Sequence, residues 1–229
     1  MGLKSAYLDY IYESVMATVG SLQGKRMLEL GNQHIFETSI REKTGKEYYS
    51  NRGVQHTSVD LNGLDGAIEV DLSKPIEIAG WNEYFDIVTN SGTSEHVSPK
   101  KAQYECFMNI HKCLKVGGVA IHLIPDIDEL VNRGYWKNHC KYYYSGEFVK
   151  MLIENNSYKL VSSRIIGGLI CFSVQKMGSV PFMKDREEFL KYIVVKKSGI
   201  RTSLSDNGWS IRARARFRSA VRTFRERVA

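Results

Sequence analysis

The sequence lacks any apolar run long enough to cross a bilayer, and its first residues lack the hydrophobic core of a signal peptide. These two absences favour a cytoplasmic protein. The four cysteines show none of the short paired spacings that bind zinc, so we expect reduced, mostly buried thiols and no metal site. Internal repeats and low-complexity segments are also absent. A chain of 229 residues is then most simply one α/β domain with additions.

Excess charge is missing from most of the chain. Residues 210–229 hold seven arginines and one glutamate, a net charge of +6, which leaves +1 of the formal +7 for all earlier residues. Without a basic groove elsewhere, the sequence does not favour a nucleic-acid partner. Spaced apolar residues in this tail predict a basic amphipathic helix. Packing on the domain or on a partner subunit, contact with an anionic membrane surface and binding of a polyanion all stay open as its role.

Apolar patterns predict alternating strands and helices along residues 5–176. Strand-like runs at 27–30, 57–60, 67–71, 85–90 and 119–124 are separated by helical or irregular stretches, and a helix over 5–19 precedes them. Gly117 and Gly118 are expected to end a helix near 104–114, and a loop from Pro125 to Tyr144 precedes a helix capped by Ser145. Two strands, 158–166 and 169–176, then form a hairpin, and a further helix is expected over 185–196. The pattern predicts a Rossmann-like, mostly parallel sheet of seven strands with a C-terminal antiparallel hairpin, flanked by helices.

Carboxylates stand at or just after three of the predicted strand ends. They are Glu29, Asp60 and Asp71. Ligands of open parallel sheets collect at the carboxyl ends of the strands, because the loops diverge there. A cavity lined by carboxylates suits a ligand with hydroxyls, amines and a positive sulfonium, and it repels the phosphates of a dinucleotide. This favours S-adenosylmethionine over NAD.

Several segments between residues 25 and 176 resemble the class I S-adenosylmethionine-dependent methyltransferases, and among them the small-molecule type. Glu29-Leu30-Gly31 is similar to the family's first glycine turn, and Glu95-His96 is similar to its pair after the fourth strand. The resemblance implies that Asp60 contacts ribose hydroxyls and Asp71 the adenine amino group. The implied cofactor-binding residues are Glu29, Gly31, Asn32, Gln33, Asp60, Leu61, Asp71, Leu72 and Asn90.

Two residues depart from the family's glycine pattern. Gln33 and Ile35 stand where the family has its second and third glycines. One interpretation is a wider turn in which Asn32 or Gln33 bonds to the methionine end of the cofactor. The other is a degenerate site that binds no cofactor. We favour the wider turn because acids are kept at three strand ends.

Candidate catalytic residues follow from the chemistry of methyl transfer. The sulfonium is already activated, so the protein mainly aligns the acceptor and removes one proton. His96 is the first candidate for the base, since imidazole titrates near neutral pH. Glu95 and His139 are the other candidates, with His139 expected to orient a substrate hydroxyl. His111 is expected on a helix surface and His122 in the sheet, and neither is assigned a role.

The sequence therefore predicts a methyltransferase acting on a small-molecule hydroxyl, such as that of a sugar or a glycolipid precursor, with an amine as the second choice. Its rival is a catalytically inactive methyltransferase-like module that works through the arginine-rich tail. A nucleic-acid methyltransferase is a third interpretation, but residues 90–93 are Asn-Ser-Gly-Thr where amino-methylating enzymes carry a Pro-Pro-Tyr type of loop. We expect an N-terminal helix in 1–22, the methyltransferase domain in 23–178 and a helical extension in 179–229. The oligomeric state is open.

Overall fold

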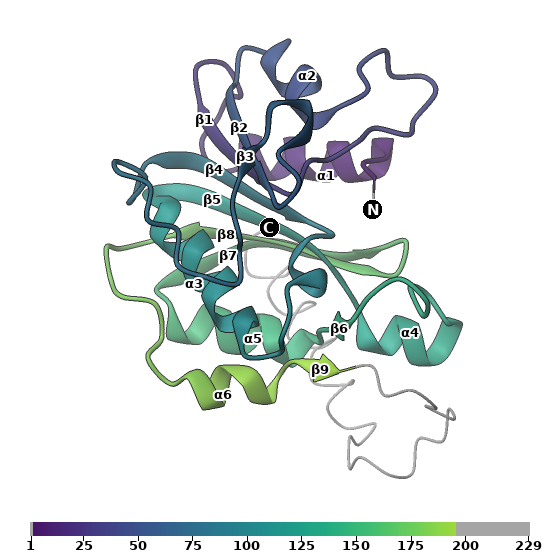
Figure 1. Cartoon of the computed structure of the whole chain (residues 1–229), viewed down its shortest axis with the longest axis vertical. Helices are drawn as coiled ribbons and strands as arrows, with labels where there is room; N and C mark the ends of the chain where they lie inside the picture. Colours follow the sequence, from purple (N-terminus) through teal and green to yellow (C-terminus); the bar gives the residue numbers. More distant parts are fainter. Residues whose placement is uncertain (1, 196–229) are drawn as a thin grey trace, which may run out of the picture. The chain divides into compact units, whose positions relative to one another are not determined.

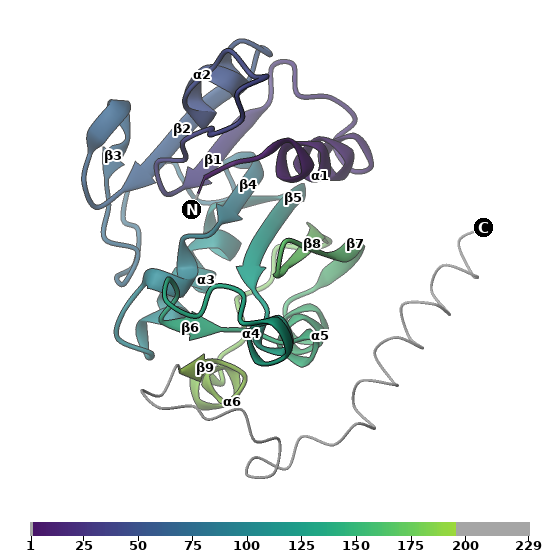
Figure 2. The same ribbon diagram turned by 90° about the vertical axis from the view of Figure 1, so that its right-hand side faces the viewer.

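The computed structural model describes residues 2–195, so the predicted amphipathic helix of the tail lies outside the described residues. Its central element is a seven-stranded sheet in the order β3-β2-β1-β4-β5-β8-β7 (Figures 1 and 2). The strands are β1 (Arg26–Leu30), β2 (Gln55–Asp60), β3 (Ile68–Glu69), β4 (Phe85–Ser91), β5 (Leu114–Pro125), β7 (Tyr158–Ile166) and β8 (Leu169–Lys176). Neighbours among β1 to β5 pair in parallel, whereas β8 is antiparallel to both β5 and β7. The predicted sheet with its C-terminal antiparallel hairpin is confirmed.

Helices cover both faces of the sheet (Figure 1). They are α1 (Ser5–Met16), α2 (Gly45–Ser50), α3 (Ala102–Cys113), α4 (Ile127–Arg133), α5 (Gly146–Asn155) and α6 (Arg186–Lys191), with single 3-10 turns η1 (Leu64–Gly66) and η2 (Ser94–His96). A second, two-stranded sheet pairs β6 (Tyr142–Tyr143) with β9 (Val194–Val195). The predicted cap is confirmed, because the Ser145 side chain accepts a hydrogen bond from the backbone N–H of Phe148 at the start of α5.

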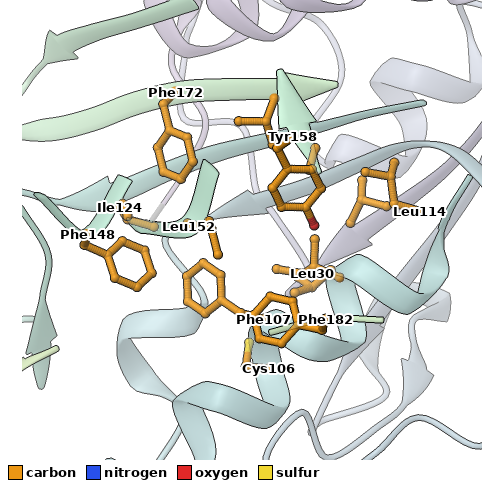
Figure 3. Close-up of a cluster of buried hydrophobic side chains, with 14 of the residues drawn as sticks. Leu30, Cys106, Phe107, Leu114, Ile124, Phe148, Leu152, Tyr158, Phe172 and Phe182 are labelled. Carbon is orange, nitrogen blue, oxygen red and sulfur yellow. The ribbon is translucent and has the colours of Figure 1, made fainter. Parts of the chain in front are cut away.

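Side chains alternate across the sheet and divide the core into two main clusters. On β1, Leu28 and Leu30 join a large cluster with aromatic side chains of α3, α5 and α6, whereas Met27 joins a second cluster with α1 and α2 (Figure 3). Phe182 and Phe189 belong to the large cluster, so residues beyond 178 complete the same core. The predicted domain boundaries themselves stay a prediction.

Two local predictions between the fourth strand and α5 are wrong. Gly117 and Gly118 do not end a helix, because α3 ends at Cys113 and β5 begins at once; the pair lies inside β5, where Gly117 has φ +81°. The expected loop from Pro125 to Tyr144 contains α4 and β6. Asp126 caps α4 by accepting a hydrogen bond from the backbone N–H of Asp128.

Other expectations are corrected in extent. The predicted strand at 67–71 is only Ile68–Glu69, and the helix expected over 185–196 is α6, whose cap is Asp185. His111 does not lie on a helix surface but is buried, where its ring contacts the Tyr158 hydroxyl and the Val180 carbonyl. The four cysteines are buried and unbridged, as predicted. No helix among residues 2–195 is both long and apolar enough to cross a membrane.

Candidate functional site

A cleft of about 450 Å³ opens at the carboxyl ends of the central strands. It brings together eight of the predicted site residues, namely Gly31, Asn32, Gln33, Asp60, Leu61, Asp71, Leu72 and His96. The other four, Glu29, Asn90, Glu95 and His139, do not line it. Segments separated by up to 65 residues in the sequence thus meet at the edge where ligands of parallel sheets collect.

The turn after β1 fits only glycine at its first position. Gly31 has φ +80°, which side chains rarely adopt, and an added Cβ would collide with Oγ1 of Thr93. The same Thr93 hydroxyl donates a hydrogen bond to the Leu30 carbonyl at 2.7 Å. The turn therefore packs closely against the loop after β4, and Thr93 occupies the space that a side chain at position 31 would need.

Gln33 is buried within this turn although it borders the cleft. Its Nε2 lies 3.3 Å from Oγ1 of Thr93 and 3.5 Å from the Leu30 carbonyl, and its Oε1 has no hydrogen-bond partner. The amide nitrogen is thus held by the protein while the amide oxygen is left for another donor. Ile35, the second departure from the glycine pattern, packs into the cluster around α1 and does not line the cleft.

Asp60 ties the glycine turn to the end of β2. Its Oδ2 accepts a hydrogen bond from the backbone N–H of Asn32 at 2.9 Å, and its Oδ1 accepts one from the backbone N–H of Asn62 at 3.1 Å. Each carboxylate oxygen can accept a second hydrogen bond, so both keep capacity for hydroxyl donors. The Asn32 side chain points to the next loop, where its Nδ2 donates to Asp65 at 2.7 Å.

Asp71 supplies a second charged acceptor beyond β3. Its Oδ1 accepts hydrogen bonds from the hydroxyl and the backbone N–H of Ser73 at 2.6 and 3.0 Å, and Lys74 lies 3.0 Å from Oδ2. The Ser73 hydrogen bonds, together with Lys74, lower the pKa of this carboxyl, which keeps it ionised at neutral pH. Apolar side chains flank Asp60 and Asp71 in the cleft: Val59, Leu61, Val70, Leu72 and Val97.

Glu29 and Asn90 stand at strand ends but face away from the cleft. Glu29 is buried under α2; its Oε1 accepts a hydrogen bond from the Gln33 backbone N–H at 3.3 Å, and its other oxygen lies against Gly45. Asn90 is buried and bonds to Ser94 through both its side-chain oxygen and its nitrogen. Both residues hold cleft-lining turns in place, and their expected contact with the cofactor stays a prediction.

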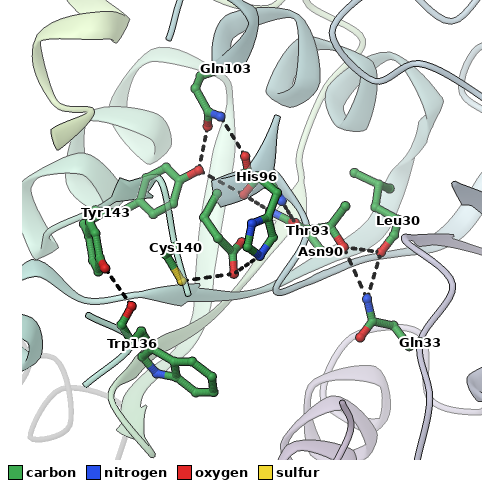
Figure 4. A network of polar contacts seen from close by, with 12 residues as sticks. Leu30, Gln33, Asn90, Thr93, His96, Gln103, Trp136, Cys140 and Tyr143 are labelled. Atoms are coloured by element: carbon green, nitrogen blue, oxygen red, sulfur yellow. Dashed lines mark hydrogen bonds and ion pairs between the residues drawn. The ribbon is translucent and has the colours of Figure 1, made fainter. Parts of the chain in front are cut away.

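A buried hydrogen-bond network fixes the turn that carries Glu95 and His96 (Figure 4). The Tyr144 hydroxyl contacts Oγ of Ser94 at 3.0 Å and Oε1 of Gln103 at 2.6 Å. Nε2 of Gln103 donates to the carbonyls of Ser94 and Val97, both at 2.6 Å. Tyr144, which directly follows β6, thus joins α3 to η2 through its hydroxyl.

The three predicted catalytic residues gather at one end of the cleft. The rings of His96 and His139 make an edge contact with centroids 4.8 Å apart, and Nε2 of His96 lies 4.0 Å from Oε1 of Glu95. Burial raises the pKa of the Glu95 carboxyl to about 7. Burial, followed by the neighbouring His139, lowers the pKa of His96 to about 4, so this imidazole is neutral at neutral pH. Only His96 of the three borders the cleft.

The sequence reasoning missed several cleft residues, among them Gly92, Thr93, Ser98 and Lys141. Thr93 and Ser98 flank the Glu-His pair, so their closeness in sequence could have identified them. Lys141 comes from the segment before β6, and its backbone N–H donates to the Glu95 carbonyl at 3.3 Å. Its position depends on a long excursion after β5 that no local pattern predicts.

The strand order, the antiparallel β8 between β5 and β7 and the cleft at the strand ends define the class I methyltransferase fold. Solved structures share this fold. The 1,6-didemethyltoxoflavin-N1-methyltransferase of Burkholderia thailandensis, solved with 1,6-didemethyltoxoflavin and S-adenosylhomocysteine, superposes with a TM-score of 0.52 at 16% identity, over 76% of this chain and 82% of that one. The N-methyltransferase NodS of Bradyrhizobium japonicum, in complex with S-adenosylhomocysteine, gives 0.51 at 13% identity over 75% and 86%.

A third similar structure is an S-adenosylmethionine-dependent methyltransferase from Clostridium acetobutylicum, with a TM-score of 0.53 at 13% identity over 74% of this chain and 90% of that one. No family model matches the sequence, and no curated protein does. At identities this low, the superpositions establish the shared fold alone. The chemistry of this chain must be argued from its own cleft.

Proposed function

We propose that the protein transfers a methyl group from S-adenosylmethionine to a hydroxyl of a small molecule, with a sugar or a glycolipid precursor as the predicted acceptor. The observation that supports this most is the single cleft shared by the Gly31 turn, Asp60 and Asp71. The three suit the three parts of the cofactor: the Gly31 turn suits the amino-acid end, Asp60 the ribose and Asp71 the adenine. The similar structures with bound S-adenosylhomocysteine support the same cofactor.

Asp60 and Asp71 are suited to the adenosine part. Asp60 has remaining acceptor capacity on both oxygens for the two ribose hydroxyls, while its backbone partners fix its orientation. Asp71 is ionised and lies beside Leu72, so it can accept from an exocyclic amino group while apolar side chains pack on the ring. Both carboxylates would repel a pyrophosphate, which disfavours a dinucleotide.

The Gly31 turn fits the methionine end. Gly31 borders the cleft, and the unpartnered Oε1 of Gln33 offers an acceptor for the α-ammonium group. A buried amide oxygen normally has a donor. The wider-turn interpretation therefore has support from Gln33, whereas Ile35 no longer bears on the cleft because it packs in the core.

The acceptor enters at the end of the cleft bordered by His96, Ser98 and Lys141. S-adenosylmethionine supplies an activated methyl group, so the chain has to align the acceptor and take up one proton. A cleft of this size suits a small molecule, and the Burkholderia enzyme was solved with a small-molecule ligand. Assignment of the proton acceptor to His96, with Glu95 and His139 as alternatives, stays a prediction.

Titration calorimetry with S-adenosylmethionine and S-adenosylhomocysteine tests the proposal directly. We expect both to bind, and we expect Asp60→Ala to weaken binding by about 10- to 100-fold, as loss of hydrogen bonds to a charged group does. Asp65→Ala is the matched control, because Asp65 contacts Asn32 on the same rim but does not line the cleft. Absence of heat with either ligand at high concentration contradicts the proposal.

The arginine-rich tail provides a separate test against the binding-module alternative. Deletion of residues 210–229 should leave cofactor binding and methylation of a soluble acceptor unchanged within about twofold, because every residue assigned above lies within 31–141. A protein that binds no cofactor with or without the tail, and that loses a binding partner on deletion, would instead favour the tail as the working part. Its predicted contacts with a membrane surface, a polyanion or a partner subunit stay predictions.

A further inference from the structure

Three side chains with metal-binding atoms converge behind the His96 end of the cleft (Figure 4). Glu95 and His96 come from η2, and Cys140 comes from the segment before β6. Oε1 of Glu95 lies 4.0 Å from Nε2 of His96 and 3.9 Å from Sγ of Cys140. The three ligand atoms all lie within 4.8 Å of one another. The cluster therefore offers one oxygen, one nitrogen and one sulfur donor around a common point.

One side-chain polar atom of Glu95 and one of His96 have no hydrogen-bond partner, whereas the other Glu95 oxygen, Oε1, accepts a hydrogen bond from Sγ of Cys140. Glu95 has no exposed surface, and its Oε2 lacks a hydrogen-bond partner. Nε2 of His96 is also buried and lacks one, although the residue borders the cleft. Within residues 2–195, no lysine or arginine forms an ion pair with Glu95. Buried carboxyl groups are normally paired, hydrogen-bonded or bound to a metal, and here the first two are incomplete.

We propose that Glu95, His96 and Cys140 bind one divalent ion of the zinc class. A carboxylate, an imidazole and a thiolate are all ordinary zinc ligands, and the two anionic ligands would balance the charge of the ion in this buried position. Tetrahedral zinc with bonds of 2.0 to 2.3 Å places its ligand atoms about 3.3 to 3.5 Å apart. The separations from Glu95 to His96 and to Cys140 need to shorten by about 0.4 to 0.7 Å, and the one between His96 and Cys140 by at most about 1.3 Å, which side-chain rotations can achieve.

The site adds to the proposed function without depending on it. Three protein ligands leave one position of a tetrahedral ion open for water, as in catalytic zinc sites. Because His96 borders the cleft, the ion lies next to the place proposed for the acceptor. An ion there would polarise an acceptor hydroxyl that reached the open position. Metal binding is measured without S-adenosylmethionine, so it can fail or succeed independently of methyl transfer.

The test uses the full-length protein, stripped with a chelator and titrated with zinc or cobalt(II) under reducing conditions. We expect one zinc per chain and, with cobalt, a thiolate-to-metal charge-transfer band in the near ultraviolet. Cys140→Ser should abolish the band and weaken zinc binding by at least about 100-fold, because even outer-shell changes cost 10- to 100-fold. Cys171→Ser is the matched control, since Cys171 is a buried thiol on β8 in the cluster around α1.

Glu95→Gln gives a second variant that keeps the shape of the side chain if Cys140→Ser fails to fold. It should retain the cobalt–thiolate band at high cobalt but weaken zinc binding by at least about 10-fold. Circular dichroism of each metal-stripped variant checks the fold. A zinc content near zero, a cobalt spectrum without a thiolate band, or a band that survives Cys140→Ser would each overturn the site.

Discussion

The carboxyl groups on the two sides of the cleft differ in their exposure to solvent and in their hydrogen bonding. On the rim formed after β1 to β3, Asp60 and Asp71 are partly exposed and accept hydrogen bonds from backbone and hydroxyl groups. At the turn after β4, Glu95 is buried, its Oε2 has no partner and burial raises its pKa to about 7. The carboxylates of the rim are thus accessible both to solvent and to a ligand. The turn instead holds polar atoms that only a specific partner can satisfy.

Gly31→Ala is expected to have the largest effect, because the turn at Gly31 on the rim packs against Thr93 in the turn after β4. The positive φ and the collision of the new Cβ with Thr93 should lower the free energy of unfolding by about 2–3 kcal/mol. Affinity for S-adenosylhomocysteine should fall at least about 10-fold, since the turn must shift. Gly24→Ala is the control, with φ +73° and nothing within 4 Å of its added Cβ. Equal losses in both variants would show that contact with Thr93 is unimportant.

A pH-dependent effect is expected from His122, which supports the β4 turn from within the sheet. Its ring is stacked between Phe107 and Phe172, and burial lowers its pKa to about 3. The unfolded chain therefore takes up the proton first, and stability contributed by the neutral ring is lost as pH falls below about 6.5. From pH 8 to pH 5 this loss is about 2 kcal/mol.

Denaturant unfolding of the wild type and of His122→Gln at pH 8 and pH 5 measures this loss of stability. Groups common to both proteins cancel in the comparison. We expect the variant to be less sensitive to the drop in pH by about 2 kcal/mol. The same pH dependence in both proteins would exclude His122 as its source.

Matched hydrogen-bond deletions compare the two sides more directly. Tyr144→Phe removes a buried hydroxyl that contacts Ser94 and Gln103, and should lower the free energy of unfolding by about 1–2 kcal/mol. Ser73→Ala removes a hydroxyl that donates to the partly exposed Asp71, and should cost less than about 0.5 kcal/mol. Chemical denaturation measures both. Losses of similar size would contradict the division into a buried and a solvent-exchanging side.

Gln33→Ala should have an effect on ligand binding alone, confined to one end of the cofactor. Loss of a single amide acceptor should weaken S-adenosylhomocysteine binding by about 5- to 15-fold. Binding of 5′-methylthioadenosine, which lacks the amino-acid end, should stay within about twofold of wild type. Calorimetry with both ligands separates the outcomes. An equal loss for the two would place Gln33 in support of the turn and not at the ammonium group.

Sequence patterns were sufficient for the sheet because its strands are apolar runs separated by turns. Asp60 and Asp71 could be placed at the cleft because they follow strand ends. Glu29 and Asn90 are the last residues but one of β1 and β4, where alternation decides the face, so their position near a strand end did not show that they lie outside the cleft. Glu29 shares its face with Met27 and points under α2, which the period of two could have shown.

Long-range features could not be predicted in this way. Cys140 reaches Glu95 across 45 residues, and it does so through α4 and a two-residue strand that pairs with β9. Short elements of this kind are stabilised by tertiary contacts, so their own sequence carries little pattern. The absence of paired cysteine spacing was correctly observed, yet a ligand set drawn from distant segments has no spacing to detect.

The division of the core into two clusters has a consequence for the order in which the protein folds during synthesis. The cluster around α1 has its last buried member at Cys171, whereas the large cluster includes Phe189 and Ile193. At ribosomal rates of about 5–20 residues per second, the 22 residues from Cys171 to Ile193 take about 1–4 seconds to make. During that interval one face of the sheet has all its residues and the other still exposes aromatic surface, which makes it the face open to chaperones and to aggregation.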